Sequence, residues 1–364
     1  VKLTAQIKLL PTPEQAQALE KTMLLANQAC NYLSEVAWEK KTFGQYALHK
    51  LAYYACKERF ELSSQIIVGC LAKVADAYKL DKQVQPTFKP LGALTYDSRV
   101  ITFNIAKSLV SIWTLEGRQK IAFVCGERQR QLLQTQQGES DLCLVKGKFL
   151  VNATCIVEEP TLEDVKDVLG VDLGIVKLAT DSSGESFSGE AVENTRKRYG
   201  KLRAALQSCG TKSAKRHLKK LSRKQAKFQA DTNHVISKKL VLKAKAQKSA
   251  LSIESLTGIR KGEKKRLRKT QRAKHSNWAF SQLRLFLTYK AKRYGVELVT
   301  IQPQYTSQRC YCCGYIEKAN RKSQSHFECV SCGYSNNADI NAALNIRLLG
   351  LPIVKQPIVS ALAG

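Results

Sequence analysis

The alternation of apolar and polar positions predicts a strand followed by helices at the start of the chain. Residues 2–10 alternate, which is typical of a half-buried β-strand. Thr12, Pro13 and Gln15 then form a capping-box signal with proline at the first helical position, and apolar residues follow at helical spacing to about residue 40. Further helical pattern covers residues 45–58 and 63–80. We therefore expect a helical bundle over residues 12–81.

From about residue 85 the pattern becomes typical of β-structure. Residues 100–105 and 120–124 predict strands, and residues 142–157 predict a hairpin that turns at Lys146-Gly147. The helices separate these strands from the first one. We therefore expect residues 1–11 and 82–160 to form one small β-barrel with a helical insertion.

A third region, starting near Val165, mixes strands and helices. Residues 168–174 predict a buried strand, and residues 177–180 its partner, with a turn at 181–184 before a strand near 185–188. Short apolar strands are expected at 249–253 and 296–301, and helices at 191–247 and 276–294. This indicates an α/β domain over residues 161–304 and 336–364, with a separate module at 305–335, in an α+β multidomain chain.

Composition places the chain among globular proteins. Of 364 residues, 44% are hydrophobic, which is enough for a sizeable core. No apolar run reaches the 18 or so residues of a membrane span. The first ten residues lack a signal-peptide layout. We expect a cytoplasmic protein.

The positive charge of the chain is concentrated in one segment. Of the net charge of +29, residues 196–274 carry +24, from 27 lysines and arginines against three acids. Such a concentration indicates a polyanionic partner. A solvated lysine-rich surface is the plainer alternative, although such surfaces usually mix both signs. A membrane surface is a weaker alternative, because these helices lack a sustained aromatic or leucine face.

Four cysteines have the spacing of a metal site. Cys310 and Cys313 form one C-x-x-C pair, Cys329 and Cys332 form another 15 residues later, and a glycine follows each pair. Four thiolates at this spacing predict one closed, structural zinc site. A redox pair or loose thiols are the alternatives.

Two other residues near this site, one cysteine and one histidine, are not predicted to bind the zinc ion. Cys312 cannot share the C-x-x-C geometry with Cys313, and His326 would be a fifth ligand. The seven other cysteines are scattered along the chain and are expected to behave as small buried hydrophobes in a reducing compartment.

Three acids lie where a predicted buried element begins or ends. Asp172 follows an apolar strand, Glu254 ends another, and Asp339 opens an apolar helix. A charge there is costly unless it is paired or bound to metal. Acids from separate elements can together supply the oxygen ligands of two magnesium ions for phosphodiester hydrolysis.

Taken singly, Asp172 could be a turn residue and Asp339 a helix cap. Glu254, an isolated acid in the most basic segment, is either an ion-pair partner or part of a site.

The chain resembles TnpB, the insertion-sequence protein related to the type V CRISPR nucleases. The residues that carry the resemblance are Gly170-Val171-Asp172-Leu173-Gly174, Ile253-Glu254-Ser255-Leu256, Tyr305-Thr306-Ser307-Gln308-Arg309-Cys310 and Asn337-Ala338-Asp339-Ile340-Asn341-Ala342-Ala343. The order of the motifs, the cysteine module just before the third acid and the total length also agree. Residues 1–164 agree in pattern and order only.

The resemblance implies an RNase H-like (RuvC) nuclease domain with an inserted zinc ribbon, a β-barrel wedge domain and a helical recognition domain. It implies that Asp172, Glu254 and Asp339 bind two magnesium ions and that a guide RNA, encoded near the element, pairs with a double-stranded DNA target beside a short flanking motif. Ser255 stands where the family often has Asn or Asp, which removes no ligand. The implied activity is magnesium-dependent RNA-guided DNA cleavage at the prokaryotic nucleoid.

Basic and aromatic side chains are the candidate nucleic-acid contacts. Aromatic residues around the cysteines, Tyr311, Tyr315, Phe327 and Tyr334, could stack on unpaired bases or cover a small core. The candidate phosphate-binding residues are Lys215, Arg216, Lys219, Lys220, Arg260, Lys261, Lys264, Lys265 and Arg266. Three other functions stay open: an RNA-guided DNA-binding repressor that does not cut, a transposase with strand-transfer activity, and a structural RNA-binding protein.

Overall fold

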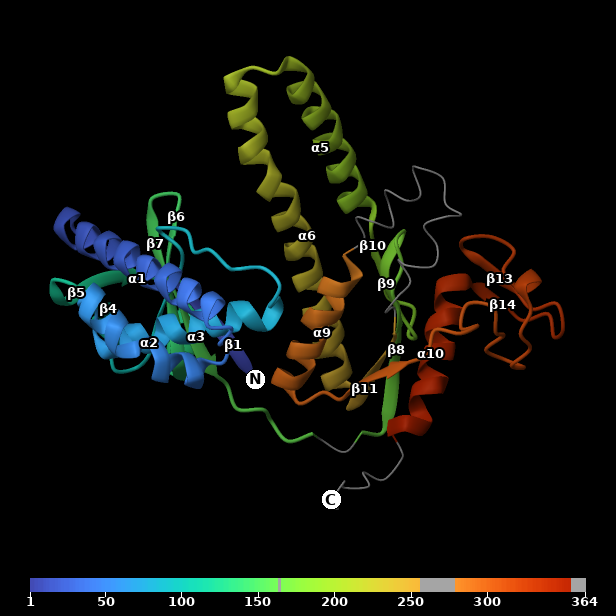
Figure 1. Ribbon diagram of the computed structural model, residues 1–364. Coiled ribbons are helices and arrows are strands. Elements are labelled where there is room, and N and C mark those ends of the chain that lie inside the picture. The colour runs from blue at the N-terminus through green and yellow to red at the C-terminus, as the bar shows by residue number, and fades with distance from the viewer. Residues whose placement is uncertain (163–164, 256–278, 355–364) are drawn as a thin grey trace. The chain divides into compact units, whose positions relative to one another are not determined.

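The computed structural model describes residues 1–162, 165–255 and 279–354. The chain divides into two compact units, residues 1–157 and 158–364, and each is described by itself. Both units combine helices with sheets, so the chain is an α+β multidomain protein (Figure 1). Within the described ranges, no helix is long and apolar enough to cross a membrane.

The first unit is a seven-stranded antiparallel sheet with three helices inserted after its first strand. The strand order is β2-β6-β7-β1-β5-β4-β3, so the first strand lies inside the sheet between β7 and β5. The elements are β1 (Lys2–Leu10), α1 (Pro13–Glu39), α2 (Gln45–Phe60), α3 (Ser64–Leu80), β2 (Leu94–Tyr96), β3 (Ile101–Asn104), β4 (Leu109–Thr114), β5 (Gly117–Val124), α4 (Glu127–Leu133), β6 (Gln136–Val145) and β7 (Lys148–Ile156).

The start of α1 confirms the capping box predicted from the sequence. The Thr12 hydroxyl accepts a hydrogen bond from the Gln15 backbone N–H, and the Gln15 side chain accepts one from the Thr12 N–H. The apolar stripe of α1 is fully buried against α2 and α3. Elements β2, β4 and α4 were not predicted.

The second unit is built on a five-stranded sheet of order β10-β9-β8-β11-β12. Strands β8, β11 and β12 are parallel, and β9 and β10 extend the sheet with antiparallel pairings. The elements are β8 (Asp167–Asp172), β9 (Lys177–Asp181), β10 (Ser186–Ser188), α5 (Glu190–Cys209), α6 (Lys212–Ala246), β11 (Ser249–Glu254), α9 (Phe280–Tyr294), β12 (Leu298–Ile301), a 3₁₀ turn (Lys318–Asn320), β13 (His326–Glu328), β14 (Ser335–Asn337) and α10 (Ala338–Val354).

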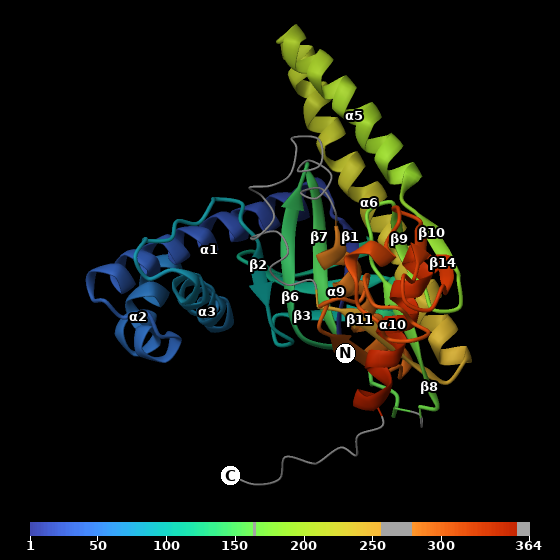
Figure 2. The same cartoon turned by 90° about the vertical axis from the view of Figure 1, so that its right-hand side faces the viewer.

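Helices cover both faces of this sheet. Helices α6 and α9 pack together on one face, where Val171 and Ile253 join Leu240 and Leu287 in the core. Helix α10 runs along β8 on the opposite face (Figures 1 and 2). The start of the helix expected at 276–294 and Leu256 of the second acid's motif lie outside the described residues.

Candidate metal centres

Two parallel strands carry Asp172 and Glu254 to the same edge of the second unit's sheet. Val171 of β8 lies opposite Ile253 of β11, and each is followed by its acid. Neighbouring strands are about 4.8 Å apart. The two carboxylates therefore start from adjacent backbone positions, although 81 residues separate them in the sequence.

Two glycines let α10 lie directly on these strands. A side chain at Gly170 of β8 would collide with the backbone of Ala343 in α10. A Cβ on Gly350 of α10 would lie 2.7 Å from the Ser252 Oγ on β11. The close packing that glycine permits therefore fixes the height of α10 above the sheet.

The direction of α10 places Asp339 at the same edge. Side chains alternate along a strand, so Asp172 shares the α10 face with Gly170. Helix α10 runs antiparallel to β8, because Ala343 lies against Gly170 while Gly350 lies against Val168. Asp339 comes one helical turn before Ala343 and so extends toward the end of β8 that carries Asp172.

The charges of Glu254 and Asp339 both act on Asp172. Burial, and after it the negative charges of Glu254 and Asp339, raise the pKa of Asp172 to about 7 against an opposing effect of Arg321. Burial also raises the pKa of Glu254 and of Asp339. Carboxylates held together at such a cost are typical of a cation-binding site.

Polar residues to which the sequence analysis gave no role complete this arrangement. The buried Thr306 hydroxyl donates a hydrogen bond to Glu254 Oε1. The side-chain amide of Asn345, fully buried in α10, donates to the Thr306 carbonyl oxygen at 3.0 Å. Arg321 Nη2 lies 3.7 Å from Asp339 Oδ1. The signal for Asn345 was available, because a buried asparagine in a largely apolar helix requires hydrogen-bond partners.

Asp339 is not the residue that caps α10. The Asn337 side-chain oxygen accepts hydrogen bonds from the backbone N–H of Asp339 at 3.0 Å and of Ile340 at 3.3 Å. Asn337 therefore performs the capping role that the sequence allowed for Asp339. The Asp339 carboxylate is therefore not needed as a helix cap and can bind a cation together with the neighbouring acids.

The four predicted cysteines form a tight cluster. Among the described residues, Cys310, Cys313, Cys329 and Cys332 are the one set of three or more potential metal ligands whose atoms all lie within 4.8 Å of one another. The carboxylate oxygens of the three acids do not all lie within 4.8 Å of one another. The acids therefore share one edge of the sheet but are not arranged around a single ion. Carboxylates around two ions about 4 Å apart are spread more widely than ligands of one ion.

The sulfur separations match tetrahedral zinc better than a disulfide. The Cys310 and Cys332 sulfurs are 3.7 Å apart, and those of Cys313 and Cys329 are 3.6 Å apart. Four ligands at about 2.3 Å from zinc lie about 3.8 Å from one another, whereas a disulfide needs about 2.05 Å. The donor set therefore fits zinc.

Each C-x-x-C pair turns its backbone amides toward a thiol. Gly314 and Gly333 have φ of 76° and 73°, as expected for glycines that close tight turns. Although burial acts in the opposite direction, the amides of Cys332 and Ser331 lower the pKa of the Cys329 thiol. Such amides stabilise thiolates.

Comparisons with known proteins identify the family. Residues 280–346 match the model of the Cas12f1-like TNB domain, and residues 152–260 match that of a probable transposase. The chain is 36% identical to CRISPR-associated endodeoxyribonuclease Cas12f1 of Syntrophomonas palmitatica over 49% of its own length and 38% of that protein. It is 26% identical to Cas12f1 of Sulfoacidibacillus thermotolerans over 88% of its own length and 89% of that protein.

A third relative links the chain to insertion-sequence proteins. The putative RNA-guided DNA endonuclease InsQ of Escherichia coli is 30% identical over 56% of this chain and 54% of its own. The chain thus spans well under two thirds of the first and third of these relatives. The chain is a TnpB/Cas12f-type protein.

A solved structure supports the fold of this TnpB/Cas12f-type chain. The protein in a cryo-EM structure of a Cas12f1–sgRNA–target DNA complex aligns over 91% of this chain and 81% of its own, with a TM-score of 0.65 and 16% identity. The TnpB resemblance is therefore confirmed, and the likeness to the solved structure concerns the fold alone.

The other predicted residues of this TnpB/Cas12f-type chain have mixed outcomes. Phe327 is fully buried with Cys310, Cys329 and Ala338, so of the two roles left open for it, the structure favours covering a small core. Tyr315 is 45% exposed. Neither Cys312 nor His326 belongs to the four-sulfur cluster.

The predicted phosphate-binding residues fall in two groups. Lys215, Arg216, Lys219 and Lys220 are exposed on α6, which pairs with α5 in a long helical hairpin (Figure 1). The others, Arg260, Lys261, Lys264, Lys265 and Arg266, lie outside the described residues.

Proposed function

We propose that the chain is an RNA-guided DNA endonuclease. A guide RNA pairs with the target strand next to a short flanking motif, and the three-acid site hydrolyses phosphodiester bonds. The observation that carries this proposal is the convergence of Asp172, Glu254 and Asp339 at one sheet edge. The chain's similarity to two Cas12f1 endodeoxyribonucleases and to the putative RNA-guided DNA endonuclease InsQ supports the proposal.

The proposal assigns the finer fold as follows. The second unit is an RNase H-like (RuvC) nuclease domain over residues 161–304 and 336–364, of which 355–364 lie outside the described residues, with a zinc ribbon inserted at 305–335. In the first unit, residues 1–11 and 82–160 form a β-barrel wedge domain, and residues 12–81 form a recognition domain. The sheet order, the four-cysteine cluster and the helical insertion after β1 support these assignments.

The three acids would hold two magnesium ions, because they offer only oxygen donors and because bound cations would offset the burial that raises the pKa of each. When bound, these ions supply an activated water and stabilise the leaving oxygen. The four cysteines would hold one structural zinc ion.

The chain's own residues orient the site and balance its charge. Thr306 fixes one oxygen of Glu254, and Asn345 fixes the backbone of Thr306 from α10. Arg321, from the cysteine module, places a positive charge beside Asp339, where it can also face a phosphate. The basic side chains exposed on α6 contact the backbone of the guide RNA or of its duplex with DNA.

The test begins with RNA that co-purifies with the full chain. That RNA is sequenced, and duplex DNA matched to its guide segment is incubated with the complex, with and without magnesium. We expect magnesium-dependent cuts in the matched duplex alone, which would take place in the cell at the nucleoid in the cytoplasm. Guided binding without cutting would instead indicate a repressor, and joined DNA products would indicate a transposase. No bound RNA and no guided binding would overturn the proposal.

A further inference from the structure

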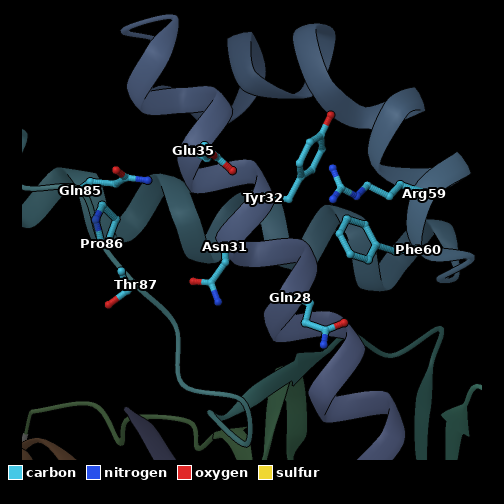
Figure 3. A pocket seen from close by; sticks show the side chains of 9 residues that line it. All are labelled: Gln28, Asn31, Tyr32, Glu35, Arg59, Phe60, Gln85, Pro86 and Thr87. Atoms are coloured by element: carbon cyan, nitrogen blue, oxygen red, sulfur yellow. The ribbon is translucent and has the colours of Figure 1, made fainter.

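A cavity in the first unit is lined by aromatic, charged and amide side chains. It has a volume of about 530 Å³, within the range of small-ligand sites, and is open to solvent. One stripe of α1, the end of α2 and the segment at 85–87 form its walls (Figure 3). The lining residues are Gln28, Asn31, Tyr32, Glu35, Arg59, Phe60, Gln85, Pro86 and Thr87.

Buried hydrogen bonds hold the wall formed by residues 85–87 against α1. The Asn31 side chain accepts from the Phe88 N–H at 2.7 Å and donates to the Phe88 carbonyl at 3.0 Å. The Ser34 hydroxyl donates to the Pro86 carbonyl at 2.7 Å. The cavity is therefore formed before any ligand arrives, which lowers the ordering cost of binding.

The side of the cavity at the end of α2 consists of flat groups. The Tyr32 and Phe60 rings are 5.8 Å apart, and the Arg59 guanidinium carbon lies 4.9 Å from the Tyr32 ring and 5.6 Å from the Phe60 ring. Figure 3 shows Arg59 extending toward Tyr32 beside Phe60. Aromatic rings and a guanidinium plane are the surfaces on which nucleobases stack.

The rim of the cavity offers polar groups of opposite kinds. The side chains of Gln28, Glu35 and Arg59 form no hydrogen bond or ion pair with any described residue, although each can bind a polar ligand. Arg59 only donates, a Glu35 carboxylate only accepts, and the Gln28 amide does both. A ligand that fits must therefore be flat and carry both donors and acceptors.

These features discriminate between ligand classes. A phosphate or carboxylate would be repelled by Glu35, and an aliphatic group would leave Arg59, Glu35 and Gln28 without partners. A nucleobase meets both requirements. One with an exocyclic amino group beside a ring acceptor, such as cytosine, suits Glu35 and Arg59 better than uracil, whose single N–H donor lies between two carbonyl oxygens.

We propose that this cavity binds one unpaired nucleobase, stacked against the flat groups of Tyr32, Phe60 and Arg59. The proposal rests on the proposed function only in taking a nucleic acid as the partner. The base can come from RNA or from single-stranded DNA, since both carry cytosine.

The test is ultraviolet crosslinking of the full chain, freed of co-purified nucleic acid in high salt, to short single-stranded oligocytidylate in RNA and DNA form. Mass spectrometry locates the adducts, and the yield at Tyr32 or Phe60 against oligonucleotide concentration gives the affinity of this site alone. We expect an adduct there, and about tenfold weaker crosslinking with Arg59→Gln or Tyr32→Leu.

Lys57→Gln is the matched control, because Lys57 is an exposed cation on the same helix that does not line the cavity. It should change the affinity by at most about twofold, since an exposed charge outside the cavity adds only a screened, general attraction. Arg59 is also exposed, so its variant should fold even if Tyr32→Leu does not. The RNA and DNA arms show which nucleic acid supplies the base, and oligouridylate should crosslink less.

Adducts found only outside the cavity, or equal effects of Arg59→Gln and Lys57→Gln, would overturn the proposal. Neither result depends on a guide or on cleavage. A chain that cuts guided DNA without this adduct would thus refute the base-binding cavity alone. A chain with the adduct but without guided cutting would refute the proposed function alone.

Discussion

The four-cysteine cluster and the three-acid site are built in opposite ways. All four thiols come from 23 consecutive residues, and two tight turns suffice to bring them within 4.8 Å of one another. The acids come from β8, β11 and α10, and span 168 residues. Their proximity depends on a parallel strand register and on glycines that let α10 approach the sheet.

The two sites also treat their charges differently. At the cysteine cluster, burial raises the pKa of the Cys310 thiol although two backbone amides oppose it, whereas amides lower the pKa of the Cys329 thiol against burial. At the acid site, burial and mutual repulsion raise the pKa of Asp172. The first arrangement suits a closed structural ion. The second holds three buried acids whose raised pKa values a bound cation would lower. Such an arrangement suits ions that must also contact a substrate.

The largest expected effect separates cutting from binding. Asp339→Ala should lower guided DNA cleavage at least 100-fold, because an anionic ligand for the ions is lost and a single electrostatic contribution of this kind is worth about 3 kcal/mol. DNA binding, which depends on lysines, arginines and base pairing, should persist. The measurement is magnesium-dependent cleavage beside a binding assay on the same sample.

The matched control is Asn337→Ala, which removes the cap of α10 and leaves all three acids in place. It should cost about 1 kcal/mol of stability and should still cut at low temperature. If Asp339→Ala cuts normally while Asn337→Ala does not, the roles assigned to these two residues are reversed.

The second prediction concerns coupling between the two sites. Cys329→Ser should reduce the zinc content from about one ion per chain to nearly none, because metal binding supplies the folding energy of such modules. Cutting should fall too, since Arg321 and the contacts of the Asn341 side chain with Tyr311 and Arg309 belong to this module. Elemental analysis and the cleavage assay test both points.

Cys312→Ser is the control for that substitution, because Cys312 is exposed and outside the sulfur cluster. It should keep both zinc and cutting. Normal cleavage by a zinc-free Cys329→Ser protein would show that the acid site does not depend on the cysteine module.

How much the sequence predicts depends on how local each feature is. The cysteine cluster follows from spacing alone, and the long periodic helices α1 and α3 were predicted nearly to their ends. Strand β2 has three residues and helix α4 has seven, which is too short for a periodic signal. β4 alternates well over six residues but was not predicted.

The acid site was predicted in its residues but not in its surroundings. Asp172, Glu254 and Asp339 stood out because each charge adjoins an apolar element. Thr306 and Arg321 carry no such signal, since a polar residue in a loop is ordinary until the fold places it. Their roles depend on contacts made across 52 and 18 residues, which only the three-dimensional arrangement provides.

The third prediction tests the contact between Arg321 and Asp339, which joins the cysteine module to the acid site. Arg321→Gln should lower cleavage about tenfold, because a positive charge next to Asp339 and the scissile phosphate is lost. The zinc content should not change, since no cysteine is touched. Lys322→Gln, the loss of an exposed cation one residue away, should have little effect. Equal losses in both variants would indicate general DNA attraction and not a role at the acids.

The smallest expected effect tests the electrostatic difference directly. The pKa of Asp172 is raised to about 7 in the folded chain, against about 3.9 for an ordinary aspartate. A raised carboxyl pKa gives stability that is complete below the unfolded pKa and is lost as pH rises through the folded value. The wild type should therefore lose stability relative to Asp172→Asn, which cannot ionise, between pH 6 and pH 8.5. One pKa unit corresponds to about 1.4 kcal/mol, so the advantage of Asp172→Asn should grow by about 1 kcal/mol.

Thermal melting is measured without magnesium and without a chelator, so that the cysteine cluster keeps its metal. Adding magnesium should reverse the order at pH 8.5, because ionised acids bind it. An advantage that is equal at both pH values would show that burial and repulsion do not raise the pKa of Asp172, and the contrast with the amide-stabilised Cys329 thiol would fail.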